Sequence, residues 1–146
     1  MATRPYRALR VLLYVIAALE GLVGILLLFA TNWILALVPL GPGIFAAVET
    51  LLLLKAIGIV MLALAYLLYA AARDPVRYIA VVDALAFILI AAAAINLYAV
   101  VALHAGDLYP GPYLIARAVV QLLLAIVVIA LRPKVAQGAA SETVAS

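Results

Sequence analysis

The residues of this sequence that could do chemistry are the few polar side chains inside long apolar runs. Glu49 and Lys55 share one run, and Glu20 lies in the run before it. A charge at the depth of the lipid core costs roughly 2.5 to 3.5 kcal/mol on insertion scales, so each should meet a partner or water. The complete intramembrane polar set is Glu20, Glu49, Lys55, Asp83, Asn96, Arg117 and Gln121.

Two interpretations of this set stay open. Ion pairs and hydrogen bonds between helices could fix how the helices pack, which is a purely structural role. Alternatively, Glu20 could lie in a polar cavity, where it takes up and releases a proton or binds a cation. A tight pair with Lys55 would keep Glu20 ionised and make it a poor proton carrier, whereas separation from Lys55 would make it a candidate.

Other chemistries lack the residues that they need. The chain has no cysteine and a single histidine, His104, so thiolate metal sites, Fe–S clusters and two-histidine haem sites are excluded. The sequence contains no Gly-rich phosphate loop, Ser/His/Asp arrangement or HExxH motif. We therefore expect no metal, no cofactor and no enzyme activity, and we interpret His104 and Asp107 as residues of a solvated turn.

The composition is that of an integral membrane protein. Of 146 residues, 72% are hydrophobic and 10% are charged, whereas soluble domains are about 45 to 50% apolar. Four apolar runs are each long enough to cross a hydrocarbon core of about 30 Å. The sequence predicts an all-α transmembrane four-helix bundle, a single domain over 1–134 with helices near 8–30, 44–72, 76–103 and 113–131. Residues 135–146 are predicted to form a disordered cytoplasmic tail.

The first run is interpreted as a retained span. A signal peptide also begins with charge followed by apolar residues, but its apolar region is about 7 to 15 residues long and ends at a small-residue cleavage site. The run at 8–30 is longer and has no clear site before Trp33. Ala17, Gly21 and Gly24 form a stripe of small residues on it, which favours close helix packing.

The basic residues predict orientation. Two connections, those between the first and second runs and between the third and fourth, carry no Lys or Arg. The positive-inside bias therefore places both termini in the cytoplasm, and the Ala-, Leu- and Arg-rich composition favours a bacterial cell (inner) membrane. Because the charges flank helix ends, we expect no nucleic-acid partner. The seven flanking residues are Arg4, Arg7, Arg10, Arg73, Arg77, Arg132 and Lys134.

A possible internal repeat has a period of 70 residues. This shift aligns Pro5 and Arg7 with Pro75 and Arg77, and it also aligns the Gly-Pro pairs that begin at 41 and 111. A duplicated helical hairpin would place two copies in the same orientation. Convergent turn chemistry would give the same matches.

Depth along the runs predicts which charges meet. At about 1.5 Å of rise per residue, Glu20, Lys55 and Gln121 come near the midplane, and Glu49 and Arg117 lie in the outer half. We therefore predict two ion pairs, Glu20 with Lys55 and Glu49 with Arg117.

The third run is predicted to present polar groups in two directions. Asp83 lies toward the cytoplasm, where Arg77 or Arg10 is the expected partner, and Asn96 lies in the outer half. Thirteen residues separate Asp83 from Asn96, which places them roughly 140° apart around a helix. One of the two is therefore expected to face a partner protein or an identical subunit.

Two local patterns resemble known families. The segment Ala17-Ala-Leu-Glu20-Gly, in the first of four short spans, resembles the small multidrug resistance exporters, which implies proton and drug coupling through Glu20. The resemblance covers one helix, and this chain departs from it in its additional charges and longer outer turns. Val48-Glu49 followed by Gly58 resembles DoxX-like membrane proteins, which are mostly of undefined activity.

The leading functional prediction is a non-enzymatic accessory or scaffold subunit. Its short connections and stripes of small residues suit packing in the bilayer against a membrane protein partner or against itself as a homo-oligomer. The alternative is a small proton- or cation-coupled transporter that uses Glu20 and Lys55.

Overall fold

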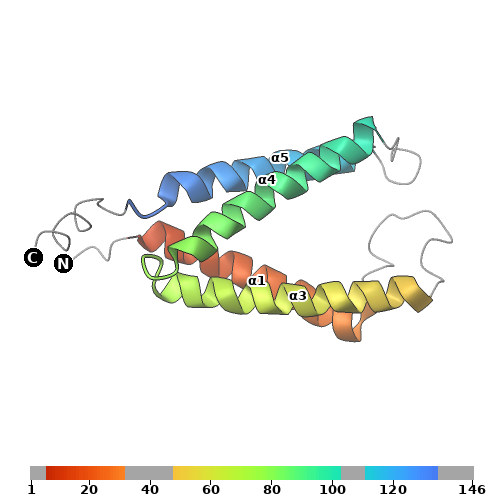
Figure 1. Cartoon of the computed structure of the whole chain (residues 1–146), viewed down its shortest axis with the longest axis horizontal. Coiled ribbons are helices and arrows are strands. Elements are labelled where there is room, and N and C mark those ends of the chain that lie inside the picture. Colours follow the sequence, from red (N-terminus) through yellow and green to blue (C-terminus); the bar gives the residue numbers. More distant parts are fainter. Residues whose placement is uncertain (1–5, 32–47, 103–110, 135–146) are drawn as a thin grey trace, which may run out of the picture.

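The computed structural model describes residues 6–31, 48–102 and 111–134, and within these ranges all regular structure is helical. The helices are α1 (Arg7–Phe29), α3 (Val48–Arg73), α4 (Ile79–Val101) and α5 (Gly111–Leu131) (Figure 1). All four are long and apolar enough to cross a membrane. The chain therefore has the architecture of a small multi-pass membrane protein.

Two helix boundaries differ from the prediction for local reasons. The helix expected from residue 76 begins at Ile79, because residues 74–78 form a turn in which the Arg77 backbone N–H donates to Asp74 Oδ1 at 3.1 Å. The helix expected from residue 113 begins at Gly111. Pro112 fits the first helical turn, where the hydrogen that proline lacks has no intrahelical acceptor.

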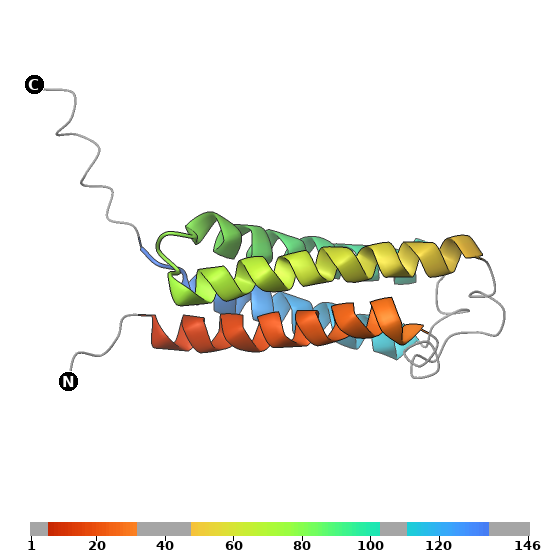
Figure 2. The same cartoon turned by 90° about the horizontal axis from the view of Figure 1, so that it is seen from below.

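The α1–α3 hairpin is packed through glycines. A Cβ atom added to Gly24 would lie 2.9 Å from the Gly58 carbonyl oxygen, and one added to Gly58 would lie 3.0 Å from the Gly24 oxygen. The two backbones therefore touch at this level. Near the other end of the hairpin, Tyr14 and Tyr69 form an edge contact with their ring centroids 5.7 Å apart. Figure 2 shows the two helices side by side along their lengths.

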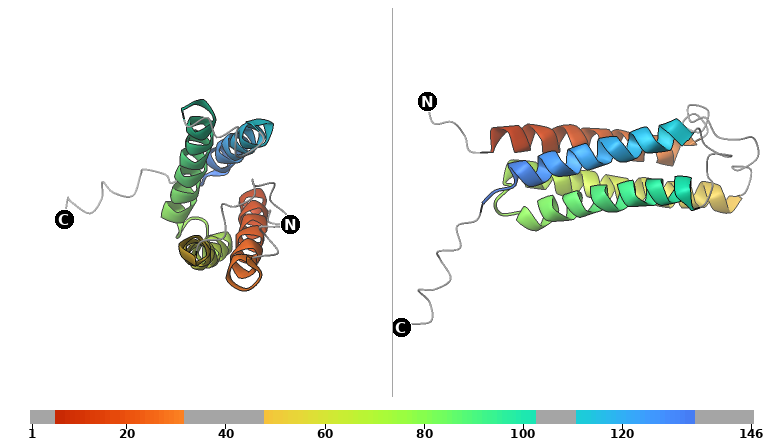
Figure 3. Two further views of the ribbon diagram at one scale, coloured as in Figure 1. Left: turned by 90° about the vertical axis from the view of Figure 1, so that its right-hand side faces the viewer. Right: turned by 90° about the horizontal axis from the view of Figure 1, so that it is seen from above.

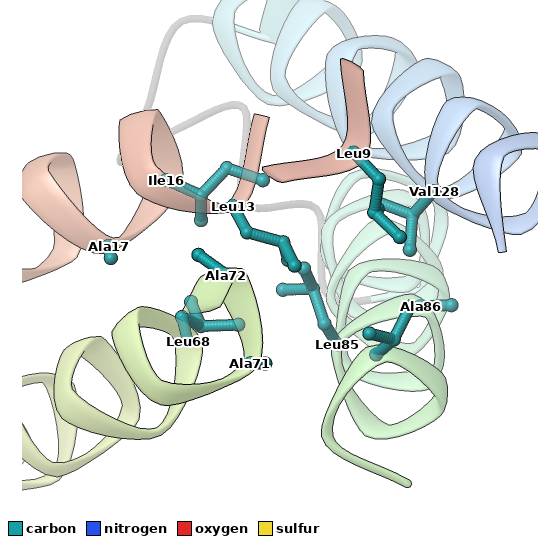
Figure 4. Close-up of a cluster of buried hydrophobic side chains, with 11 residues drawn as sticks. Leu9, Leu13, Ile16, Ala17, Leu68, Ala71, Ala72, Leu85, Ala86 and Val128 are labelled. Atoms are coloured by element: carbon teal, nitrogen blue, oxygen red, sulfur yellow. The ribbon is translucent and has the colours of Figure 1, made fainter. Parts of the chain in front are cut away.

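The four helices share a buried core in one half of the molecule. Leu9 and Leu13 of α1, Leu68 of α3, Val82 of α4 and Val128 of α5 are all fully buried there. Figure 4 shows Leu9 against Val128, and Leu13 between α3 and α4. The core lies where α1 and α4 begin and where α3 and α5 end.

Away from this core the two hairpins separate. Figure 1 shows α1–α3 and α4–α5 meeting at the core end and diverging toward the other, and the end-on view in Figure 3 shows two separate helix pairs. We call the two regions the closed half and the open half. Leu27, a buried residue of the open half, packs within a hairpin, because it lies next to Gly58 of α3.

Several sequence predictions concern features that the structure does not test. The side of the membrane on which the termini lie and the duplicated hairpin both stay predictions. The connection containing Trp33, the turn containing His104 and Asp107, and the tail at 135–146 lie outside the described residues.

Candidate functional site

Most of the predicted polar set continues the stripes of core residues from the closed half into the open half. On α1, Glu20 follows Leu9, Leu13 and Ile16 at helical spacing, so it lies on the same face. On α4, Asn96 continues the series Val82, Ala86 and Ala93. On α5, Gln121 and Arg117 lie two and three turns before Val128. The structure therefore places these four polar residues on inward faces.

Asn96 and Gln121 form a hydrogen bond between α4 and α5. The Asn96 Nδ2 donates to Gln121 Oε1 at 2.8 Å, and both side chains are half-buried. Each amide thus satisfies part of the other's hydrogen-bonding capacity at a depth where water is scarce. This pair was not predicted, because the two residues were expected at different depths.

Asp83 is paired with Arg132, not with the predicted Arg77 or Arg10. Arg132 Nε donates to Asp83 Oδ1 at 2.5 Å and Nη2 donates to Oδ2 at 2.7 Å, which is the two-pronged geometry of a guanidinium on a carboxylate. This hydrogen bonding raises the pKa of Arg132, which lies just beyond the end of α5. The side chains remain 46% and 43% exposed.

The prediction that Asp83 or Asn96 faces another subunit stays a prediction, although both residues bond within the chain. Arg132 follows the last residue of α5, and its long side chain reaches the side of α4 that carries Asp83. Both bonds tie α4 to α5.

Glu20 and Lys55 do not pair, which contradicts the first predicted ion pair. The Gly24–Gly58 contact fixes the register of the antiparallel hairpin, and this register places Lys55 beside the C-terminal end of α1. Lys55 is exposed, and with Leu28 and Thr31 it lines a cavity of about 220 Å³. The last carbonyls of a helix carry partial negative charge, so the C-terminal end of α1 is a favourable neighbour for this cation.

Lys55 lies farther from the midplane than predicted, because it is near the beginning of α3. Lys55 is eighteen residues before Arg73, or about 27 Å along the helix, and a hydrocarbon core is about 30 Å thick. If Arg73 marks one surface of the bilayer, Lys55 lies near the opposite surface. Its long stem can then carry the ammonium group to water.

Glu20 and Arg117 lie at matching depths. Glu20 is about 20 Å along α1 from Arg7, and Arg117 is about 21 Å along α5 from Leu131. The two form no ion pair at salt-bridge distance, since Asp83–Arg132 is the one such pair among the described side chains.

The second predicted ion pair, Glu49 with Arg117, stays a prediction. The Glu49 side chain lies outside the described residues. Arg117 is exposed on α5.

The described residues contain no cluster of three or more His, Cys, Asp or Glu that could hold a metal ion. Comparisons of the chain with protein-family models, with curated proteins and with solved structures found no match.

The arrangement thus has two parts with different chemical capacities. The bonds Asn96–Gln121 and Asp83–Arg132 are satisfied and join α4 to α5. Glu20 and Arg117 face the open half, and neither side chain forms a hydrogen bond or ion pair with another described residue. Their free hydrogen-bonding capacity suits either a partner helix or a hydrated path.

Proposed function

We propose that the chain is a non-enzymatic accessory or scaffold subunit of a membrane assembly, in a bacterial cell membrane with both termini cytoplasmic. The observation that carries the proposal is the open half, where the inward faces of α1 and α5 separate and present Glu20 and Arg117. Such faces need a cover in lipid, because a charged side chain among acyl chains costs roughly 2.5 to 3.5 kcal/mol on insertion scales.

The proposed cover is a transmembrane helix of a partner. Acyl chains cannot satisfy a guanidinium, whereas a helix with a carboxylate or amide side chain can. The seven basic residues that flank the helices support the proposed orientation. A carboxy-terminal fluorescent-protein fusion tests that part separately, since it fluoresces only if the terminus is cytoplasmic.

The experiment for the subunit role is purification from the native membrane in a mild detergent. We expect a second membrane protein at fixed stoichiometry with the wild type, and at least about a tenfold loss of it with Arg117→Leu, as the cost above implies. Ile126→Ala is the control, because Ile126 is an exposed residue nearer the closed half of the same helix. Thermal unfolding of both variants shows whether the fold is kept.

The outcomes separate the possible covers. A complex whose mass is a multiple of the chain identifies a second copy as the cover. A monomer with no co-purifying protein contradicts the proposal, and so does a partner that Arg117→Leu leaves in place.

A carrier is the second candidate, and the separation of Glu20 from Lys55 favours it. Glu20 is half-buried at mid-depth and forms no ion pair with a described side chain, as a proton carrier requires. The test is uptake of tetraphenylphosphonium, a lipophilic cation, into proteoliposomes under an imposed pH gradient. Uptake that Glu20→Gln abolishes supports a carrier, and equal or absent uptake in both proteins removes it.

A further inference from the structure

A polar cavity lies at the turn between α3 and α4, apart from the intramembrane polar set. Its volume is about 320 Å³. It is open on one side, because Tyr66 is 71% exposed and both arginines of the turn are exposed. The polar residues that line it are Tyr66, Tyr69, Arg73, Asp74, Arg77 and Tyr78.

The walls of this cavity are held in place by local bonds. The Asp74 carboxylate accepts the Arg77 backbone N–H, and the Asp74 carbonyl accepts the Tyr78 N–H at 3.1 Å. The Arg77 guanidinium carbon lies 5.7 Å from the centroid of the Tyr78 ring, a cation–π distance. The Tyr69 ring also packs against the edge of Tyr14 on α1. The turn and two of the tyrosines that line the cavity are therefore positioned by contacts within the chain.

The charges of the cavity favour a monoanion. Arg73 and Arg77 contribute two positive charges, and Asp74 contributes one negative charge that already accepts a backbone N–H. One positive charge remains uncompensated by the cavity's own residues. Guanidinium groups match phosphate oxygens in pairs of parallel hydrogen bonds, and tyrosine hydroxyls can donate further ones.

The position of the cavity selects the kind of anion. One candidate span ends at Arg73 and the next begins at Ile79, so the cavity lies at the level where a bilayer changes from hydrocarbon to headgroups. The exposed Tyr66 lies about two turns deeper on α3 than Arg73, and a ring with an apolar body and a polar tip is favoured near the membrane interface. A ligand here would have its anion at Arg73 and Arg77 and its apolar part along α3.

We propose that this cavity binds the phosphodiester group of an anionic phospholipid of the phosphatidylglycerol class. Arg73 and Arg77 hold the phosphate oxygens, the tyrosine hydroxyls donate to the phosphate or to the headgroup glycerol, and the acyl chains lie against α3. This inference does not depend on the proposed subunit or carrier role.

The test is native mass spectrometry of the detergent-solubilised protein titrated with dioleoylphosphatidylglycerol. Dioleoylphosphatidylcholine, which is zwitterionic, serves as the second lipid. The variant is Arg73→Gln with Arg77→Gln. The matched control is Arg7→Gln with Lys134→Gln, which removes two exposed positive charges from the same end of the molecule but outside the cavity. Solubilised protein is used because altered flanking charges can change topology in cells.

We expect one phosphatidylglycerol adduct that the cavity variant weakens by at least about tenfold, since an arginine that loses its charge-assisted hydrogen bonds to the phosphate costs roughly tenfold or more. The control should change its affinity by less than about twofold, and phosphatidylcholine should bind far more weakly. Equal losses in both double variants would show diffuse surface charge and overturn the proposal. Full displacement of the lipid by inorganic phosphate would assign the site to free phosphate instead.

If the double variant does not fold, its lipid affinity cannot be compared with that of the wild type. Tyr66→Phe is therefore measured as well. It removes one hydroxyl and keeps the ring. A small fall in phosphatidylglycerol affinity with unchanged thermal stability is expected. An unchanged affinity in Tyr66→Phe contradicts the site, whether or not the double variant folds.

Discussion

The two hairpins of this protein are held together by different chemistry. In α1–α3 the backbones approach closely at Gly24 and Gly58, and no side-chain hydrogen bond joins the described residues of these helices. In α4–α5 the contacts include an amide pair and an ion pair. One hairpin depends on the absence of side chains, and the other depends on their polar ends.

The difference follows from the solvent that surrounds the helices. Lipid tails are as apolar as leucine, so burying leucine gains little, and helices associate through close packing or through hydrogen bonds. Glycine permits the first and Asn, Gln, Asp or Arg permit the second. The contrast implies that α1–α3 is sensitive to side-chain volume and α4–α5 to side-chain polarity.

The sharpest way to break the α1–α3 hairpin is to add one methyl group at its narrowest point. Gly24→Ala places a Cβ 2.9 Å from the Gly58 carbonyl oxygen, so the helices must shift apart. We expect the free energy of unfolding to fall by about 1 to 3 kcal/mol, the usual cost of overpacking. SDS titration followed by circular dichroism measures it.

Gly21→Ala is the matched control for this change. Its added Cβ would lie 3.6 Å from the Ala65 Cβ, which is an ordinary contact, and alanine is the better helix former by about 1 kcal/mol. Gly21→Ala should leave stability unchanged or raise it. Equal destabilisation by both changes would contradict the account, because only Gly24 lies close enough to the facing backbone for an added methyl group to push the helices apart.

A smaller effect is expected from the amide pair in α4–α5. Asn96→Leu removes a 2.8 Å hydrogen bond and should cost about 0.6 kcal/mol and at most about 1.7, the range for such bonds in membrane proteins. A double-mutant cycle with Gln121→Leu should show coupling of that size. Strictly additive losses would mean that the two side chains do not interact.

The smallest effect is expected at Asp83 and Arg132, because this pair is nearly half exposed. Their coupling in a cycle of alanine substitutions should be about 0.2 to 1 kcal/mol, and high salt should reduce it. The Asn96–Gln121 coupling should not respond to salt, because neither residue is charged. Thermal unfolding in a non-ionic detergent at two salt concentrations tests both. A salt-independent Asp83–Arg132 coupling would contradict its placement at a wet surface.

The four spans could be predicted from the sequence, because length and apolar composition determine whether a segment crosses lipid. The packing role of Gly24 was also predictable from its place in the stripe of small residues, and its contact with Gly58 confirms it. The inward positions of Glu20, Asn96 and Gln121 follow from the same periodicity.

The pairing of polar groups was not predictable, because it depends on the register between helices. Register is set by contacts such as Gly24–Gly58, which place Lys55 beyond the reach of Glu20. Shifting one helix of a pair by a single turn moves each partner by about 5.4 Å, which is enough to exchange one ion pair for another. The depth of a residue, when it is counted from predicted helix ends, has an error larger than one turn, so it cannot identify the partner of a charged residue.

The central claim is that the two hairpins meet at one end and separate at the other. Because the chain has no cysteine, spin labels can be attached at two introduced cysteines without background. Ala8 and Ala130 line one cavity at the closed end, whereas Phe29 and Tyr113 are exposed residues of α1 and α5 in the open half. In proteoliposomes, electron–electron resonance should give a clearly shorter distance for the 8/130 pair than for the 29/113 pair. Equal distances, or the reverse order, would contradict the account.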